Sequence, residues 1–262
     1  MKLLTAIGAF SVAVILSSVP TFAQAAKAEP KVEGLKRTPE GKVDFTGTYE
    51  WPKYLPGAKR GRSSATTFDE SVFPPLKPGG EPFIEPRTGD PRHDEPRDYC
   101  MPAGFPAGML SGNAMQFFQT KDYLVMVHEF QRMTRIIPLD GRTHRTYVEP
   151  SFYGDPVGHW EGDTLVVETT NQNGLVWLDM EGNFTTPNIH VVEKFTMKDL
   201  NQIDYEATIT DPTIYTRPWT IRGNLGRHDD KNYELMEFAC HEGNRALANI
   251  MSAARAEEAR RP

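Results

Sequence analysis

The sequence lacks the short motifs that bring a nucleotide cofactor or a hydrolase nucleophile to a protein. It contains no phosphate-binding loop, no Gly-x-Gly-x-x-Gly run and no Gly-x-Ser-x-Gly elbow, so we predict chemistry without a cofactor. Its seven histidines extend from His93 to His241, and no two have His-x-His or His-x-x-x-His spacing. We therefore predict no metal site, the alternative being a site assembled from separate strands.

Long hydrophobic runs are also scarce, and the clearest one lies at the start of the chain. Lys2 precedes a mostly apolar stretch at residues 3–19, and Ala23-Gln24-Ala25 follows as a small-x-small cleavage site. This order is typical of a secretory signal peptide. The alternative, a membrane anchor, needs roughly 20 apolar residues, and no later segment has them. We predict cleavage near Ala25 and a periplasmic or extracellular protein with no membrane span.

The chain has neither an excess of basic charge nor a large set of cysteines. Its net charge is −6, which gives no electrostatic case for binding nucleic acid. The two cysteines of an exported protein most simply form one disulfide, here between Cys100 and Cys240. Two free thiols are the alternative. A catalytic thiol is less expected, because an oxidising compartment would tend to pair it.

Proline and glycine divide the rest of the chain into parts. Residues 26–43 are polar and lack apolar periodicity, so we predict a flexible lead. The residues from 44 to 262 are predicted to form a single β-rich domain. Within it, residues 52–106 hold most of the prolines, and their turn-forming pairs predict a long irregular cover rather than strands.

The pattern around this cover is that of β-strands. We predict strands at residues 44–51, 115–120, 123–131, 134–139, 146–149, 164–170, 175–178, 189–197, 202–210, 216–225 and 233–240. Lys121-Asp122 and Asp140-Gly141 indicate hairpins, and residues 160–163 indicate a turn. Spacings of about 10–15 residues suit an all-β antiparallel fold, either a lipocalin-like barrel or a sandwich. One C-terminal helix is predicted at residues 244–260.

Several runs between residues 98 and 245 carry a resemblance to a known family. The most specific is Trp160-Glu161-Gly162-Asp163-Thr164-Leu165-Val166-Val167. Others are Cys100-Met101-Pro102, Leu139-Asp140-Gly141-Arg142, Ile189-His190-Val191-Val192-Glu193-Lys194-Phe195, Asp211-Pro212, Pro218-Trp219-Thr220 and residues 237–240. This block resembles a family of exported bacterial proteins that has no assigned activity. The resemblance implies export, a β-rich fold and paired cysteines.

Two positions depart from the usual pattern of that family. Lys194 and Glu168 stand where its members usually have arginine and aspartate. Both exchanges keep the charge. Lysine, however, cannot reproduce a bidentate arginine contact.

Ionisable side chains occur among apolar ones in the predicted strands. Glu193 and His190 point to opposite faces of one strand, and His128 and Glu129 do so on another. Whichever face is interior, burial would raise the pKa of a carboxyl group or lower that of an imidazole. Such groups, if neighbouring strands bring them together, can perform acid–base chemistry. Glu168 is a further ionisable residue on a predicted strand.

A structural role is the alternative for each of these residues. Each could form a salt bridge in the core, with partners among Arg132, Arg135, Arg217 and Arg222, or face solvent at a sheet edge. The aromatic residues admit two interpretations as well. Trp160, Trp177, Tyr205, Tyr215 and Trp219 would line an apolar pocket for a substrate, or would simply be core.

Three functions follow from these patterns. The first is a secreted, cofactor-independent lyase, hydratase or isomerase that acts on a small, largely apolar molecule. In it His190 and His128 would exchange protons, and Glu193 and Glu129 would orient or polarise. The second is a non-catalytic periplasmic binding protein for a hydrophobic ligand. The third is an envelope structural protein with a filled interior. No pattern indicates an oligomeric state.

Overall fold

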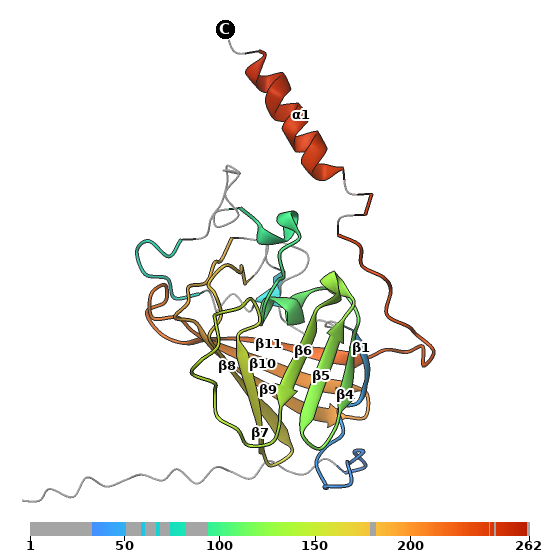
Figure 1. The fold of residues 1–262 in the computed structure, drawn as a ribbon. Coiled ribbons are helices and arrows are strands. Elements are labelled where there is room, and N and C mark those ends of the chain that lie inside the picture. The colour runs from blue at the N-terminus through green and yellow to red at the C-terminus, as the bar shows by residue number, and fades with distance from the viewer. Residues whose placement is uncertain are drawn as a thin grey trace, which may run out of the picture. The chain divides into compact units, whose positions relative to one another are not determined.

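The computed structural model describes residues 33–50, 59–60, 67–68, 74–81, 94–178, 182–240, 242–243 and 245–260. The predicted signal peptide and most of the predicted cover at residues 52–106 lie outside these residues. The fold can therefore be followed from the end of the predicted flexible lead, through nearly all of the predicted strands, to the C-terminal helix (Figure 1).

Nine strands form one antiparallel sheet in the order β6-β5-β4-β1-β11-β10-β9-β8-β7. Their bounds are Gly47–Glu50 (β1), Met115–Gln119 (β4), Tyr123–His128 (β5), Thr134–Pro138 (β6), Asp155–Glu161 (β7), Thr164–Thr170 (β8), His190–Asp199 (β9), Gln202–Thr210 (β10) and Trp219–Arg227 (β11). Lys59–Arg60 (β2) and Thr67–Phe68 (β3) form a separate two-stranded ladder. Among the described residues, three short 3-10 helices lie at Pro96–Tyr99 (η2), Ala107–Leu110 (η3) and Phe130–Arg132 (η4), and one α-helix lies at Ala246–Glu258 (α1).

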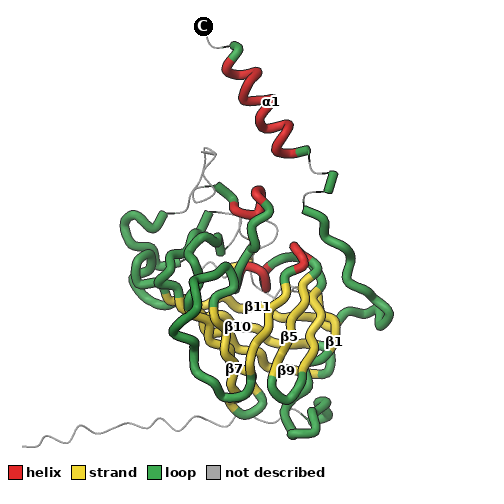
Figure 2. Tube along the Cα trace, in the orientation of Figure 1, coloured by secondary structure: helices red, strands yellow, loops and turns green. Residues whose placement is uncertain are grey.

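The sheet curls until its two outer strands, β6 and β7, lie next to each other and nearly close a barrel. Gly158 in β7 makes this approach possible. A Cβ atom there would stand 2.6 Å from Cδ2 of Leu139 and 3.1 Å from Cγ2 of Ile137. The predicted all-β antiparallel barrel with one C-terminal helix is confirmed. Figure 2 shows the strands crossing over one another, with loops gathered at their ends.

The interior of the barrel is formed by alternate residues of each strand. In β9 the buried residues are Val191, Glu193, Phe195 and Met197, whereas the residues between them are half-exposed. Aromatic rings connect the two sides. Phe195 lies 5.1 Å from Tyr205 and 6.3 Å from Phe117 between ring centroids. One continuous apolar cluster therefore links the strands of the barrel.

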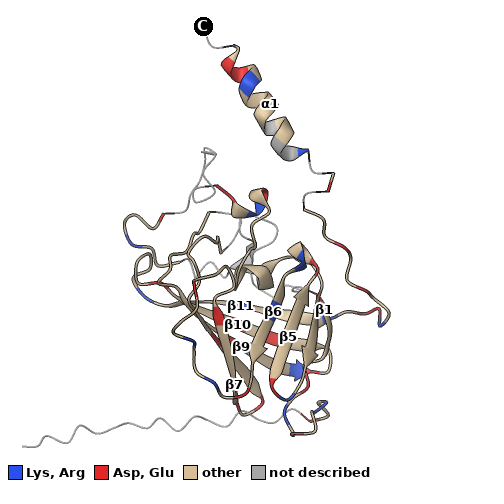
Figure 3. Ribbon diagram, in the orientation of Figure 1, with Lys and Arg blue, Asp and Glu red and all other residues tan. Residues whose placement is uncertain are grey.

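Charged residues of both signs are spread over the molecule without forming one large patch on the ribbon (Figure 3). Figure 3 shows both signs of charge on strands, on loops and on α1. Within the part of the chain that the structure describes, no helix has the length and apolar character to cross a membrane. The predicted disulfide is confirmed, because Cys100 is bonded to Cys240 with a Cα–Cα distance of 5.9 Å.

Some predicted elements are wrong. Residues 146–149 form a loop, residues 175–178 contribute only an isolated bridge between Trp177 and Phe184, and residues 233–240 form no strand. Asp140-Gly141 does not turn a hairpin, because the chain after β6 runs through a loop to β7. β7 itself was predicted only as a turn at its end. The strand was missed because Pro156 and Gly158 are residue types typical of turns. A proline is tolerated there because β7 is an outer strand of the sheet.

Candidate functional site

A buried ion pair joins β6 and β9 inside the barrel. Glu193 of β9 is 0% exposed and Arg135 of β6 is 1% exposed. Arg135 donates from Nη1 to Oε1 of Glu193 at 3.0 Å and from Nη2 to Oε2. Its Nη2 also donates to Oγ1 of Thr169 at 2.8 Å. The hydroxyl of Tyr205 donates to Oε1 of Glu193 at 2.8 Å, so the carboxylate is fixed from two sides.

His128 lies close to this pair on the inner face of β5. It is the last residue of β5, where its backbone N–H bonds Met133, and Arg135 is therefore its diagonal neighbour on β6. The ring is 1% exposed, and neither of its nitrogens has a hydrogen-bond partner. Burial and, secondarily, the charge of Arg135 lower the pKa of His128 to about 3. The imidazole is thus neutral at ordinary pH and a poor proton acceptor, yet it offers one donor and one acceptor.

Phe105 contacts both the imidazole and the guanidinium. Its ring centroid lies 4.1 Å from Cζ of Arg135 and 5.5 Å from the ring of His128. The ring of Tyr153 also lies near Phe105, with 5.6 Å between the ring centroids. Nε of Arg135 has no hydrogen-bond partner, and the residue is buried. The cluster therefore contains a second polar group that the protein leaves unsatisfied.

The segment that carries Phe105 closes one end of the barrel, where β5 ends and β6 begins. We call residues 101–113 the cover segment and this end the covered end. All four residues of η3 are buried. At Gly108 a Cβ atom would stand 2.8 Å from Cε of Met133 and 3.3 Å from Cε1 of Phe105, so the cover segment packs tightly there. Gln131 fastens it, by accepting from N of Ala103 at 2.9 Å and donating to O of Met101 at 2.8 Å.

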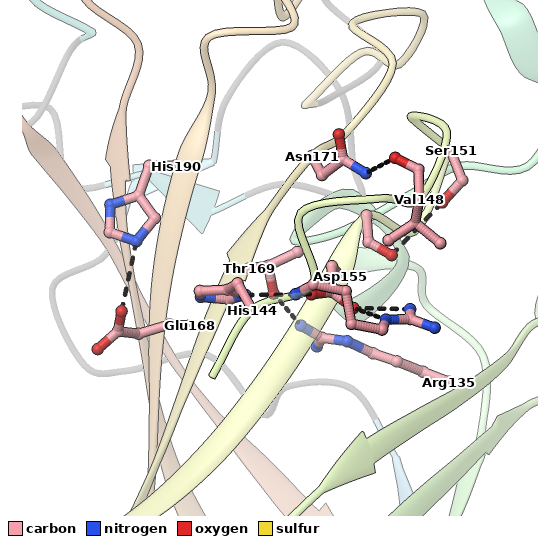
Figure 4. A network of polar contacts seen from close by, with 11 residues as sticks. Arg135, His144, Val148, Ser151, Asp155, Glu168, Thr169, Asn171 and His190 are labelled. Atoms are coloured by element: carbon pink, nitrogen blue, oxygen red, sulfur yellow. Dashed lines mark hydrogen bonds and ion pairs between the residues drawn. The ribbon is translucent and has the colours of Figure 1, made fainter. Parts of the chain in front are cut away.

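The loop at residues 139–154 is anchored at the same end (Figure 4). Asp155, the first residue of β7, accepts hydrogen bonds from N and Nε of Arg145, both at 2.7 Å. Nδ1 of His144 lies 3.5 Å from the same carboxylate. Nδ2 of Asn171 donates to O of Val148 at 3.0 Å and ties the loop to the chain after β8. This polar network positions a loop and holds no reactive group within hydrogen-bond reach of Glu193.

Glu129 does not point into the barrel. It follows His128 at the rim and accepts a hydrogen bond at 2.6 Å from the Tyr233 hydroxyl and one at 2.7 Å from N of Met236. Burial opposes the charged form of Glu129, but these hydrogen bonds outweigh it and lower the pKa. Glu129 thereby holds residues 228–240, which we call the C-terminal strap and which end at the disulfide of Cys240.

His190 lies on the outer face of β9. Its Nε2 is 3.7 Å from Oε2 of Glu168, and the two side chains are 39% and 40% exposed (Figure 4). The four predicted catalytic residues therefore occupy three places. Glu193 and His128 are interior, Glu129 is at the rim, and His190 is outside. The structure does not bring all four together.

The five predicted substrate-binding aromatics are also separated. Trp160 stacks on Phe45 at 5.9 Å, and Tyr215 meets Trp219 edge-on at 5.4 Å. Trp177 is buried in the loop that follows β8. Of the five, Tyr205 alone is tied to the interior ion pair by a hydrogen bond that the structure shows, and its pKa is raised well above the usual value by burial and by Glu193.

Neither a search for metal-binding clusters nor comparison with known proteins identifies a further site in the described residues. No group of three or more histidine, cysteine, aspartate or glutamate side chains is placed to hold a metal ion among the residues that are described. Comparison with protein-family models, with curated proteins and with solved structures found no match. The resemblance to an exported family therefore stays a prediction.

Two residues of the cluster, and one buried polar residue outside it, did not stand out in the sequence. Arg135 was only one of four possible partners, although it alternates with Ile137 on an apolar strand, which was the available signal. Phe105 lies in an irregular segment with no periodicity to place it. Gln172 is 0% exposed without a partner for either amide atom, and only the fold reveals that the loop after β8 is buried.

Proposed function

We propose that this protein binds a small, largely apolar molecule at the covered end of its barrel. The observation that carries the proposal is His128, whose two ring nitrogens are buried and unpaired. Burying a polar group without a partner costs about 1–3 kcal/mol, so few native groups are left in that state. A ligand group that hydrogen-bonds the imidazole would recover this free energy.

The surroundings of His128 suit an apolar ligand body. Phe105, Met109 and Met133 are buried side chains at this end, and methionine adapts its shape readily to a partner. The interior is closed here by the cover segment rather than by strands, so a ligand enters by displacing that segment. This arrangement supports the proposal of a binding protein, in which a few fixed polar groups would orient an apolar molecule.

The contacts favour binding over catalysis. Glu193 is held by Arg135 and Tyr205, and the low pKa of His128 makes it a weak base. His190 is half-exposed on the outer face. An acid–base enzyme would need a group that gains or loses a proton near neutral pH beside the substrate. Catalysis by these residues stays a prediction without a geometric argument in its favour.

The test uses N-phenyl-1-naphthylamine, an apolar probe with one N–H group. We expect its fluorescence to rise on binding to the full chain. His128→Leu should weaken that binding by roughly tenfold, because one hydrogen bond in a dry site is lost. The same variant should raise the free energy of unfolding by about 1–2 kcal/mol, since an unpaired polar group is removed.

The matched control is His190→Leu on the outer face of β9, which should leave the affinity unchanged. Circular dichroism would show that both variants keep the fold. Absence of any saturable probe binding, or equal loss in the two variants, would contradict the proposal.

We also propose that the protein is exported. The apolar stretch at residues 3–19 supports this, as does the disulfide between Cys100 and Cys240, a bond that forms in oxidising compartments. Mass spectrometry of the secreted or periplasmic protein should find an N-terminus at Ala26. A cytoplasmic chain with reduced cysteines would refute export.

A further inference from the structure

The unpaired donors and acceptors of the interior indicate which chemical group of a ligand could form hydrogen bonds with them. Arg135 Nε is a donor, and neutral His128 provides one donor and one acceptor. Both side chains lie next to Phe105, and they are diagonal neighbours on β5 and β6. The following inference rests on the proposed binding function and concerns the class of ligand.

The charges of the cluster are already balanced. The Arg135 guanidinium is compensated by Glu193 through two hydrogen bonds, and the imidazole of His128 is neutral. An anionic ligand would add a second negative charge to one buried positive charge, and a cationic ligand would leave a positive excess. Either costs free energy in a desolvated site, because the described residues show no further buried charge paired with this cluster.

The donors and acceptors that Arg135 and His128 leave unpaired restrict which neutral ligand groups are suitable. A ketone or ether oxygen accepts only, so the lone pair of His128 would stay unpaired. An apolar ligand satisfies neither residue. A hydroxyl group accepts from Nε of Arg135 and donates to the imidazole nitrogen, and its second lone pair is open to another donor. Of the neutral groups compared, only the hydroxyl serves both the Nε donor of Arg135 and the acceptor nitrogen of His128.

We infer that the covered end of the barrel takes a neutral hydroxyl compound with an apolar body, of the phenol or naphthol class, its hydroxyl placed between Arg135 and His128. Phe105 would lie against the ring of such a ligand, since aromatic pairs stabilise each other beyond their buried area. The neighbouring methionines would line the rest of its surface.

Three naphthalene compounds test the inference at pH 7 with the full chain. Isothermal titration calorimetry would compare 2-naphthol, which is neutral, with naphthalene, which has no polar group, and 2-naphthoate, which is charged. We expect 2-naphthol to bind roughly tenfold more tightly than naphthalene, and 2-naphthoate to bind more weakly than 2-naphthol.

His128→Leu should abolish the advantage of 2-naphthol over naphthalene while naphthalene itself still binds, which shows that the variant is folded. His190→Leu should keep that advantage. Tighter binding of 2-naphthoate, or equal binding of 2-naphthol and naphthalene, would overturn the inference and leave the binding function standing. If none of the three compounds binds, the binding function itself is refuted.

Discussion

Glu193 and His190 are three residues apart on β9 and lie in opposite environments. Glu193 is fully buried and bonded to Arg135, whereas His190 stands beside Glu168 with more than a third of each side chain exposed. Both are pairs of an acidic and a basic group. The strand alternation alone separates them, and it makes one pair part of the core and the other part of the solvated surface.

This difference in burial determines how much each pair contributes to stability. Removing one partner of a buried pair leaves an uncompensated charge in the interior, at a cost of about 3–5 kcal/mol. A solvent-exposed pair contributes roughly 0–1 kcal/mol because water screens it. The hydrogen bonds that Tyr233 and Met236 donate to Glu129 at the rim are intermediate between these two pairs in their contribution to stability.

Arg135→Met should have the largest effect on this comparison. The free energy of unfolding should fall by about 3–5 kcal/mol, since Glu193 would stay buried without its partner. Urea denaturation measures the change. Lys194→Met is the matched control, because Lys194 pairs with Glu161 on the outer face at 3.2 Å, and the change there should stay below about 1 kcal/mol.

A double variant separates the effect of charge from the effect of packing at Arg135. Arg135→Met combined with Glu193→Leu removes both charges, so most of the lost stability should return. A double variant as unstable as Arg135→Met alone would show that packing of the Arg135 side chain, and not its charge, is what the interior requires.

Acid should weaken the interior through His128. Its pKa is near the ordinary 6.5 in the unfolded chain and about 3 in the fold, so between these values the unfolded state binds more protons. The free energy of unfolding is therefore not reduced by His128 above pH 6.5, and it declines as the pH falls from 6.5 toward 3. Relative to His128→Leu, the wild type should lose roughly 3 kcal/mol between pH 7 and pH 4.

Denaturation curves of both proteins at several pH values measure this difference, in which the titration of shared groups cancels. Arg135 is the charged group that contributes to the low pKa of His128. Parallel pH profiles of the wild type and His128→Leu would contradict a buried, neutral imidazole.

Tyr233→Phe tests the rim. It removes the hydrogen bond to Glu129 and should lower the free energy of unfolding by about 1 kcal/mol. It should also make the C-terminal strap a better substrate for limited proteolysis. Tyr147→Phe is the control, because that side chain is 83% exposed, and it should change neither property.

Glu168→Gln should have the smallest effect. It removes the charge beside His190 on the outer face, and we expect a change within about 0.5 kcal/mol. Thermal denaturation at low and at high salt would measure it. A loss as large as that of Arg135→Met would mean that the outer pair has a role that its exposure does not indicate.

Much of the fold was predictable because alternation along a strand is a local pattern. The strands around Val125, Val166, Phe195 and Ile209 were predicted within a few residues of their observed bounds. β7 was missed because Pro156 and Gly158 resemble turn residues, and their tolerance depends on the outer position of this strand in the sheet. Segments without periodicity, such as the loop at residues 139–154, carried no local signal.

The candidate site was predictable only in its parts. Alternation placed Glu193 and His128 on a face with apolar neighbours, but it could not determine that both faces are interior. The pairing of Glu193 with Arg135 joins residues 58 positions apart, and it follows from the closure of the barrel rather than from any sequence pattern. Phe105 reaches the interior because the cover segment closes one end of the barrel. No hydrophobic periodicity in the sequence indicates the position of this segment.

The disulfide joins Cys100, which directly precedes the cover segment, to the end of the C-terminal strap, and this connection determines when the bond can form. Cys100 lies five residues before Phe105, and Cys240 follows β11, so β4 to β11 all lie between the two sulfurs. A chain that emerges from its N-terminus cannot lock this crosslink until every one of these strands has been made.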